Sequence, residues 1–217
     1  MRTKATILAG ALFITTSLPD VVEMNTIGTG PSLEQIQTHL NIKAYSEFKD
    51  RLGFLESSHR YGVTSPTGTY WGRYQFGPMA LEDIGFDFSR EEFLGSEVKQ
   101  EQALYYYLLR NKTLLGDYYW DYLGEEIGGI EITKAGLLAA AHLIGARSVK
   151  TYIDTDGRVV PHDGNGTPLT KYLREFQTHS FEFSDDVKEY IIANYGEEKP
   201  DPPTQMNLVH SQWINYY

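Results

Sequence analysis

The sequence predicts a mainly α-helical domain with a buried central helix and a small β-turn or hairpin region. Hydrophobic residues make up 41% of the 217 residues, which is enough to form the core of one compact domain. From Asp87 onward, apolar residues recur mostly at helical spacing. The segment 133–144 is apolar and rich in alanine, and small side chains let a helix approach its neighbours closely. We therefore expect this segment to be the central helix.

Residues 1–20 are typical of a secretory signal peptide. Arg2 and Lys4 precede an apolar run, residues 7–14, that is too short to span a bilayer as a helix. The run lacks a clear Ala-x-Ala cleavage site, so an uncleaved anchor and a buried strand stay open as alternatives. The absence of cysteine excludes a lipoprotein anchor and a disulfide framework. A cleaved signal would place the protein in the periplasm or outside the cell, with no stable membrane span.

The rest of the chain is expected to divide into a leading segment, a domain and a tail. Glycine, proline and serine at residues 28–32 indicate a linker, so residues 21–40 are interpreted as a linker and leading segment. The domain is expected at 41–195, and the proline-containing residues 196–217 are expected to form a tail. Helices are predicted at 44–57, 90–111, 133–144, 148–153, 168–176 and 184–194, with a turn or hairpin at Asp156-Gly157.

Glu56 is the main candidate for catalysis. On a helix of 3.6 residues per turn, it lies at the edge of an apolar stripe made of Tyr45, Phe48, Leu52 and Leu55. A carboxyl group held against apolar neighbours loses hydration of its charged form, so its pKa rises and it can donate a proton near neutral pH. A glycosidic general acid needs this property. In the alternative interpretation, Glu56 ends a helix and faces solvent, where Lys49 could pair with it.

Two short segments of the chain resemble motifs of one enzyme family. The first contains Glu56-Ser57, Ser65, Gly68, Gly72 and Gln75-Phe76-Gly77-Pro78. The second, residues 140–149, reads Ala-Ala-His-Leu-Ile-Gly-Ala-Arg-Ser-Val. They are similar to two motifs of lytic transglycosylases with a lysozyme-like fold, in the superfamily of soluble lytic transglycosylases and goose-type lysozymes. Gly72 and Gln75 come one residue later than in that family, Tyr74 replaces its Met, and His142 and Leu143 replace its Tyr and Asn.

This resemblance implies a function. It implies that residues 41–195 form a lysozyme-like catalytic domain that cleaves the β-1,4 bond between N-acetylmuramic acid and N-acetylglucosamine in the glycan strands of peptidoglycan. Glu56 would be the single acid/base, the product would be a 1,6-anhydro sugar, and no cofactor or metal is expected. The residues expected to bind substrate are Ser57, Ser65, Tyr74, Gln75 and His142. Ser57 would orient Glu56 or the sugar, Gln75 would hydrogen-bond the sugar, and Tyr74 would offer a stacking surface beside Tyr70, Trp71 and Tyr152.

Two other classes of function stay open. A lysozyme-type hydrolase of peptidoglycan or of a chitin-like glycan would need a second carboxylate, for which Glu82 and Asp83 are the nearest candidates. A solvated helix face at residues 79–84 explains these two acids equally well. A non-catalytic glycan-binding protein would keep its aromatic surfaces and would tolerate Glu56→Gln without loss of function.

Several further classes are disfavoured by composition and by missing motifs. A net charge of −10 argues against nucleic acid as a partner, because phosphate binding depends on clustered Lys and Arg. Asp163-Gly164-Asn165-Gly166-Thr167 is similar to the start of a calcium loop but lacks the closing acid, so a turn that caps the next helix is predicted. His59, His142 and His162 lack a His-Glu-x-x-His pattern, and the chain has no Gly-x-Ser-x-Gly elbow.

Overall fold

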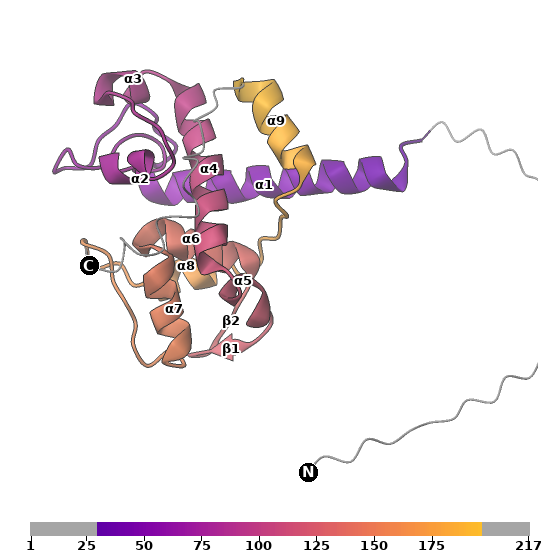
Figure 1. Cartoon of the computed structure of the whole chain (residues 1–217), viewed down its shortest axis with the longest axis vertical. Helices are drawn as coiled ribbons and strands as arrows, with labels where there is room; N and C mark the ends of the chain where they lie inside the picture. The colour runs from indigo at the N-terminus through magenta and orange to yellow at the C-terminus, as the bar shows by residue number, and fades with distance from the viewer. Residues whose placement is uncertain (1–29, 197–217) are drawn as a thin grey trace, which may run out of the picture. The chain divides into compact units, whose positions relative to one another are not determined.

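The computed structural model describes residues 30–196, and their fold is mainly helical, as the sequence predicts (Figure 1). One compact unit begins at Leu33. The predicted signal peptide and residues 197–217 of the predicted tail lie outside the described residues. Within the part of the chain that the structure describes, no helix is both long enough and apolar enough to cross a membrane.

The elements follow one another as a series of helices with one short hairpin. The helices are α1 (Leu33–Ser57), α2 (Pro78–Glu82), α3 (Arg90–Leu94), α4 (Glu97–Leu115), α5 (Tyr118–Asp121), α6 (Lys134–Ile144), α7 (Ala146–Asp154), α8 (Leu169–Glu175) and α9 (Asp185–Tyr195). The hairpin between α5 and α6 pairs β1 (Glu126–Ile127) with β2 (Ile130–Glu131) in antiparallel register, so that Glu126 lies opposite Glu131. Gly128 and Gly129 form its turn.

Helix α6 is the buried centre of the domain, which confirms the prediction for residues 133–144. Every residue from Ala135 to Ala141 is buried, and the helix packs against α4, α7 and α8 (Figure 1). Thr133 caps its start, because the Thr133 hydroxyl accepts a hydrogen bond from the Gly136 amide at 3.1 Å. Gly136 faces α8 so closely that a Cβ atom there would lie 3.2 Å from the Leu173 carbonyl oxygen. Small residues therefore let α8 lie directly against α6.

Three predicted elements differ from the observed ones. Helix α1 begins at Leu33, inside the predicted leading segment. Its first turns expose Leu33 and Leu40, so this part of the helix has no buried apolar stripe from which it could be predicted. The predicted helix at 90–111 is two helices, because the chain turns at Gly95 and the Ser96 hydroxyl caps a new start by accepting from the Lys99 amide. Asp156-Gly157 forms a turn after α7, whereas the hairpin lies at 126–131.

The segment between α1 and α2, residues 58–77, folds as a compact loop beside α4. Trp71 pairs with Phe76 through two main-chain hydrogen bonds of 2.9 Å, which closes a tight turn at residues 72–75. Gly72 has φ +76°, and a Cβ atom there would lie 2.6 Å from the amide carbon of Gln100. The buried Gln100 accepts from the Arg73 amide and donates to the Tyr61 and Phe93 carbonyls. This glycine therefore lets α4 hold the loop in place.

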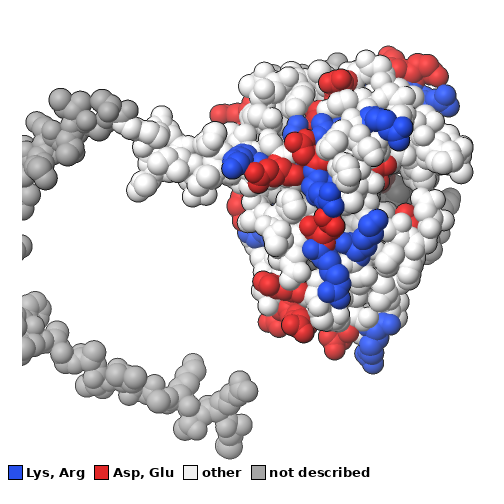
Figure 2. Space-filling model, turned by 180° about the vertical axis from the view of Figure 1, so that it is seen from behind, with Lys and Arg blue, Asp and Glu red and all other residues white. Residues whose placement is uncertain are grey.

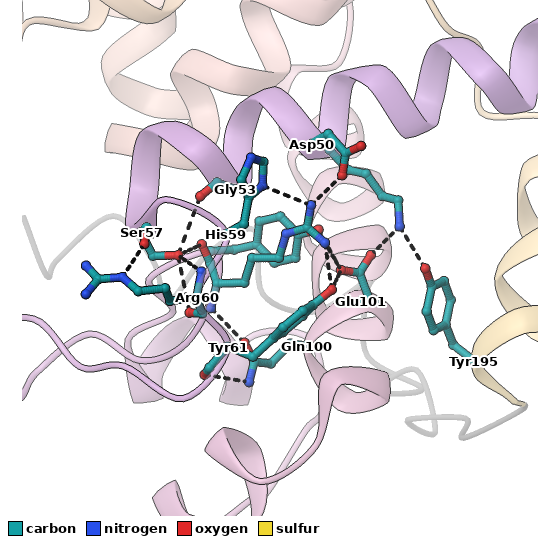
Figure 3. A network of polar contacts seen from close by, with 12 residues as sticks. Asp50, Gly53, Ser57, His59, Arg60, Tyr61, Gln100, Glu101 and Tyr195 are labelled. Atoms are coloured by element: carbon teal, nitrogen blue, oxygen red, sulfur yellow. Dashed lines mark hydrogen bonds and ion pairs between the residues drawn. The ribbon is translucent and has the colours of Figure 1, made fainter.

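A buried ion cluster, made of Lys49, Tyr61, Arg73, Tyr74 and Glu101, joins this loop to α1 and α4. The Glu101 carboxylate is fully buried and lies amid these contacts (Figure 3). Its Oε2 accepts from Lys49 Nζ at 2.7 Å. Its Oε1 accepts from the hydroxyls of Tyr61 and Tyr74, each at 2.7 Å, and from Arg73 Nη1 at 3.1 Å. One carboxylate therefore pairs with two buried cations.

The edges of the buried ion cluster reach two further parts of the molecule. Arg73 also forms an ion pair with the exposed Asp50, and Lys49 donates to the Tyr195 hydroxyl at the end of α9 (Figure 3). Gly53 makes room for the Arg73 side chain, because a Cβ atom at Gly53 would lie 2.5 Å from Arg73 Nε. A glycine in the interior of α1, which costs helix stability by itself, is thus explained by close packing.

Candidate active site

Glu56, in the last turn of α1, meets side chains from two helices that are distant in sequence. The Tyr172 hydroxyl of α8 donates a hydrogen bond of 2.7 Å to Glu56 Oε1. His142 Nε2 of α6 lies 3.9 Å from the same oxygen. The Glu56 side chain is only 13% exposed. The site thus consists of a mostly buried carboxyl group with one oxygen already held by a tyrosine.

Burial is the main influence on the acidity of Glu56. The pKa of Glu56 is raised from 4.5 to about 7, chiefly by loss of hydration and to a smaller extent by the negative charge of Asp163. The hydrogen bond from Tyr172 and the positive charge of Lys171 act in the opposite direction. Burial and the neighbouring Glu56 raise the pKa of Tyr172, so its hydroxyl stays a donor. A substantial fraction of Glu56 therefore carries a proton at neutral pH, as the sequence predicted from its apolar stripe.

His142 is a neutral neighbour of this carboxyl group. Burial lowers the pKa of His142 to about 4, and the hydrogen bond of 3.0 Å between its Nε2 and the Tyr74 carbonyl only partly offsets this effect. The contact between His142 and Glu56 is therefore not an ion pair at neutral pH. His142 is a buried neighbour of Glu56, and its substrate-binding role stays a prediction.

The raised pKa of Glu56 predicts how stability varies with pH. The folded protein binds this proton more tightly than the unfolded chain, so the stabilisation is complete below pH 4.5 and is lost as pH rises through about 7. Glu56→Gln removes this titration. We expect wild type to lose up to about 3 kcal/mol relative to Glu56→Gln between pH 4 and pH 8 in urea denaturation. Glu47→Gln, on an exposed glutamate of α1, is the matched control, and parallel pH curves for wild type and Glu56→Gln would contradict the prediction.

Ser57, Ser65 and Gln75 are engaged in holding the loop. The Ser57 hydroxyl donates to the Arg73 carbonyl at 2.8 Å and accepts from the Arg60 amide at 3.0 Å, so it fixes main chain rather than orienting Glu56. The Ser65 hydroxyl accepts from the Tyr70 amide at 3.1 Å. Gln75 has φ +50°, and its Nε2 donates to the Gly72 carbonyl at 2.8 Å. All three shape the loop that flanks the site.

Tyr74 does not offer the expected stacking surface. Its ring is fully buried, because the tight turn at residues 72–75 directs it into the buried ion cluster. What Tyr74 contributes near Glu56 is its main-chain carbonyl, which holds His142. Tyr152 is also buried, with its hydroxyl donating to the Ile127 carbonyl. Tyr70, by contrast, is 44% exposed and keeps the predicted accessible ring.

Sequence reasoning missed two residues of the site, Tyr172 and Asp163. Tyr172 lies inside a correctly predicted helix, and only the three-dimensional packing of α8 on α6 brings it to Glu56. The segment 163–167 forms the predicted turn, in which Asp163 Oδ1 accepts from the amides of Asn165 and Thr167. The turn does not cap the next helix as predicted, because α8 begins after Pro168 without a side-chain cap. Across residues 30–196, no group of three or more acidic, His or Cys side chains is placed to hold a metal ion.

Comparisons with family models, with curated proteins and with solved structures find no match to this chain. A functional assignment therefore depends on the residues around Glu56. A cavity of about 280 Å³ lies at the opposite end of α6, between Leu123, the start of α6 and residues 177–182, and it shares no lining residue with the Glu56 site. On the face shown in Figure 2, Lys and Arg alternate with Asp and Glu and form no continuous basic patch.

Proposed function

We propose that this protein is a peptidoglycan lytic transglycosylase that acts in the periplasm or outside the cell, with Glu56 as its single acid/base. The observation that carries the proposal is the mostly buried Glu56 carboxyl, whose pKa is raised to about 7 and whose Oε1 is held by Tyr172. A general acid is most effective when its pKa lies near the working pH. The resemblance of the segments around Glu56 and His142 to the family motifs supplies the reaction class.

The proposed reaction uses the two oxygens of Glu56 differently. Oε1 is occupied by the Tyr172 hydroxyl, so Oε2 carries the proton that is transferred. Glu56 protonates the glycosidic oxygen while the bond to the anomeric carbon of N-acetylmuramic acid breaks. The resulting carboxylate accepts the proton of the muramoyl 6-hydroxyl, whose oxygen bonds to the anomeric carbon. Glu56 regains its proton, no water is consumed, and Tyr172 stabilises the transient carboxylate by its hydrogen bond.

Mass spectrometry of fragments released from purified peptidoglycan tests this proposal. We expect wild type and the control Glu47→Gln to release 1,6-anhydro products, and we expect Glu56→Gln to release them about 10²–10⁴-fold more slowly. Fragments with reducing ends would show a hydrolase instead. No release by wild type from peptidoglycan or from a chitin-like glycan would leave a glycan-binding protein, whose binding would survive Glu56→Gln.

A hydrolase is the second candidate, and the position of Asp163 favours it. The Asp163 carboxylate lies near enough to raise the pKa of Glu56 by its charge. The two carboxylates proposed from sequence are less suitable as the second carboxylate. Asp83 forms an ion pair of 2.8 Å with Arg110, and Glu82 is exposed to solvent at the end of α2. In a hydrolase, Asp163 would activate water or attack the sugar while Glu56 donates the proton. Reducing ends that disappear in Asp163→Asn would establish this alternative.

A further inference from the structure

A continuous line of contacts joins the buried Glu101 to the candidate acid Glu56. Glu101 Oε1 accepts from the Tyr74 hydroxyl at 2.7 Å. The main-chain carbonyl of the same tyrosine lies 3.0 Å from His142 Nε2, and this nitrogen lies 3.9 Å from Glu56 Oε1. Tyr74 is therefore held at both ends, by its hydroxyl and by its carbonyl. The line runs from α4 through the loop 58–77 and α6 to the end of α1.

The protonation of His142 follows from this geometry. A carbonyl oxygen can only accept a hydrogen bond, so Nε2 carries the hydrogen and donates it to Tyr74. Nδ1 is buried and has no hydrogen-bond partner, which agrees with a neutral ring protonated at Nε2 alone. Phe76 and Tyr107 contact the ring edge to face, at centroid distances of 5.6 and 5.7 Å. The Tyr74 carbonyl is thus the polar group that fixes where the Nε2 hydrogen points.

We propose that Glu101 and Tyr74 are positioning residues for Glu56, because together they direct the Nε2 hydrogen of His142 to the Tyr74 carbonyl and away from the Glu56 carboxyl group. This inference rests on the proposed function for its effect on catalysis, but the geometry it describes is independent of substrate. If the Tyr74 carbonyl moved away, the imidazole ring would be free to rotate and to bring its Nε2–H toward Glu56 Oε1, which lies 3.9 Å from Nε2. A second donor at that oxygen would stabilise the carboxylate, so the pKa of Glu56 would fall and less of it would be protonated near neutral pH.

Two tyrosine variants separate this positioning role from a general loss of stability. Tyr61 and Tyr74 each donate a hydroxyl to the same oxygen of Glu101, but only Tyr74 presents its carbonyl to His142. Tyr61→Phe is therefore the matched control for Tyr74→Phe. Both variants leave unchanged the other groups that face Glu56, namely Tyr172, Asp163 and Lys171.

The experiment measures the titration of the Glu56 carboxyl carbon and the ring nitrogens of His142 by NMR in the full chain. Tyr74→Phe keeps the main-chain carbonyl but loses the hydroxyl contact with Glu101, so residue 74 is expected to shift and its carbonyl to release His142. We then expect the imidazole ring to rotate toward Glu56, the Glu56 midpoint to fall by about one pH unit and the Nε2–H resonance of His142 to shift. In Tyr61→Phe both signals should stay as in wild type. At pH 7 the kcat for glycan release should fall about fivefold in Tyr74→Phe with KM little changed, because less Glu56 is protonated, and about twofold at most in Tyr61→Phe.

Unchanged Glu56 and His142 signals in folded Tyr74→Phe would overturn the proposal, as would equal shifts in both variants. These NMR readouts keep their meaning even if wild type cleaves no glycan, so failure of the proposed function and failure of the positioning role are separable. A third variant, Glu101→Met, keeps a side chain of similar length but accepts no hydrogen bond from the Tyr74 hydroxyl, so it extends the test to the start of the line. If it folds, its Glu56 midpoint should fall in the same direction as in Tyr74→Phe, and a midpoint equal to that of wild type would limit positioning to Tyr74 and refute the role of Glu101.

Discussion

Glu101→Gln is expected to lower the free energy of unfolding by about 3–5 kcal/mol, because it leaves two buried cations without their shared counter-charge. Lys49 and Arg73 both lie against the Glu101 carboxylate in a region closed to solvent. A glutamine keeps the volume and can still accept from the tyrosine hydroxyls, so the loss reports charge rather than packing. Urea denaturation of wild type and Glu101→Gln at pH 7 and at the same protein concentration measures this loss of stability.

Two further variants show whether the loss comes from the buried charges. Asp50→Asn removes another carboxylate that pairs with Arg73, but Asp50 is 62% exposed, so its removal should cost about 0–1 kcal/mol. Lys49→Met combined with Glu101→Gln removes the buried cation whose carboxylate partner is lost, whereas Arg73 keeps Asp50, so the double variant should be less destabilised than Glu101→Gln alone. A Glu101→Gln variant as stable as Asp50→Asn would contradict the account of the buried ion cluster.

Glu56→Gln is expected to lower the rate of glycan release by about 10²–10⁴-fold, the range typical of losing a general acid or base. The wild-type rate should also depend on pH in a defined direction. Glu56 must be protonated to donate its proton to the glycosidic oxygen, so kcat/KM should fall as pH rises through about 7, the raised pKa of this carboxyl. Initial rates of soluble fragment release from pH 5 to pH 9 measure the profile.

The residual activity of Glu56→Gln provides the check. Because glutamine cannot donate a proton at any pH, the fall above pH 7 should be absent from whatever rate remains in this variant. Glu47→Gln, on the exposed part of α1, should keep both the rate and the profile of wild type. A wild-type profile that is flat between pH 6 and pH 8 would count against Glu56 as the proton donor.

The sequence was most informative where a local pattern determines the structure. The alanine-rich run at 133–144 predicted the buried α6, and the apolar stripe beside Glu56 predicted a carboxyl with a raised pKa. The Asp-Gly-Asn-Gly-Thr segment predicted a turn, because an Asp side chain can accept from amides two and four residues ahead, as Asp163 does. In each case the deciding interactions lie within a few residues of one another.

Contacts between distant segments were beyond this reasoning. Nothing in the local pattern around Tyr172 says that its hydroxyl reaches Glu56, because the packing of α8 on α6 decides it. The direction of the Tyr74 ring depends on the turn at residues 72–75 and on a carboxylate in α4. A motif comparison gives positions along the chain, but it does not say whether a residue acts through its side chain or its main chain. The predicted stacking role of Tyr74 is therefore wrong, because its ring is buried and only its carbonyl lies near the site.

The close packing at Gly136 has a consequence for Glu56. A methyl group on Gly136 would lie 3.2 Å from the Leu173 carbonyl oxygen of α8 and 3.1 Å from the Thr133 hydroxyl, so alanine would push these neighbours outward by a few tenths of an ångström. Tyr172 precedes Leu173 on that helix and would move with it, away from the oxygen it holds. Gly136 does not contact Glu56, yet its missing side chain sets how closely α8 approaches α6 and thereby the length of the hydrogen bond from Tyr172 to Glu56.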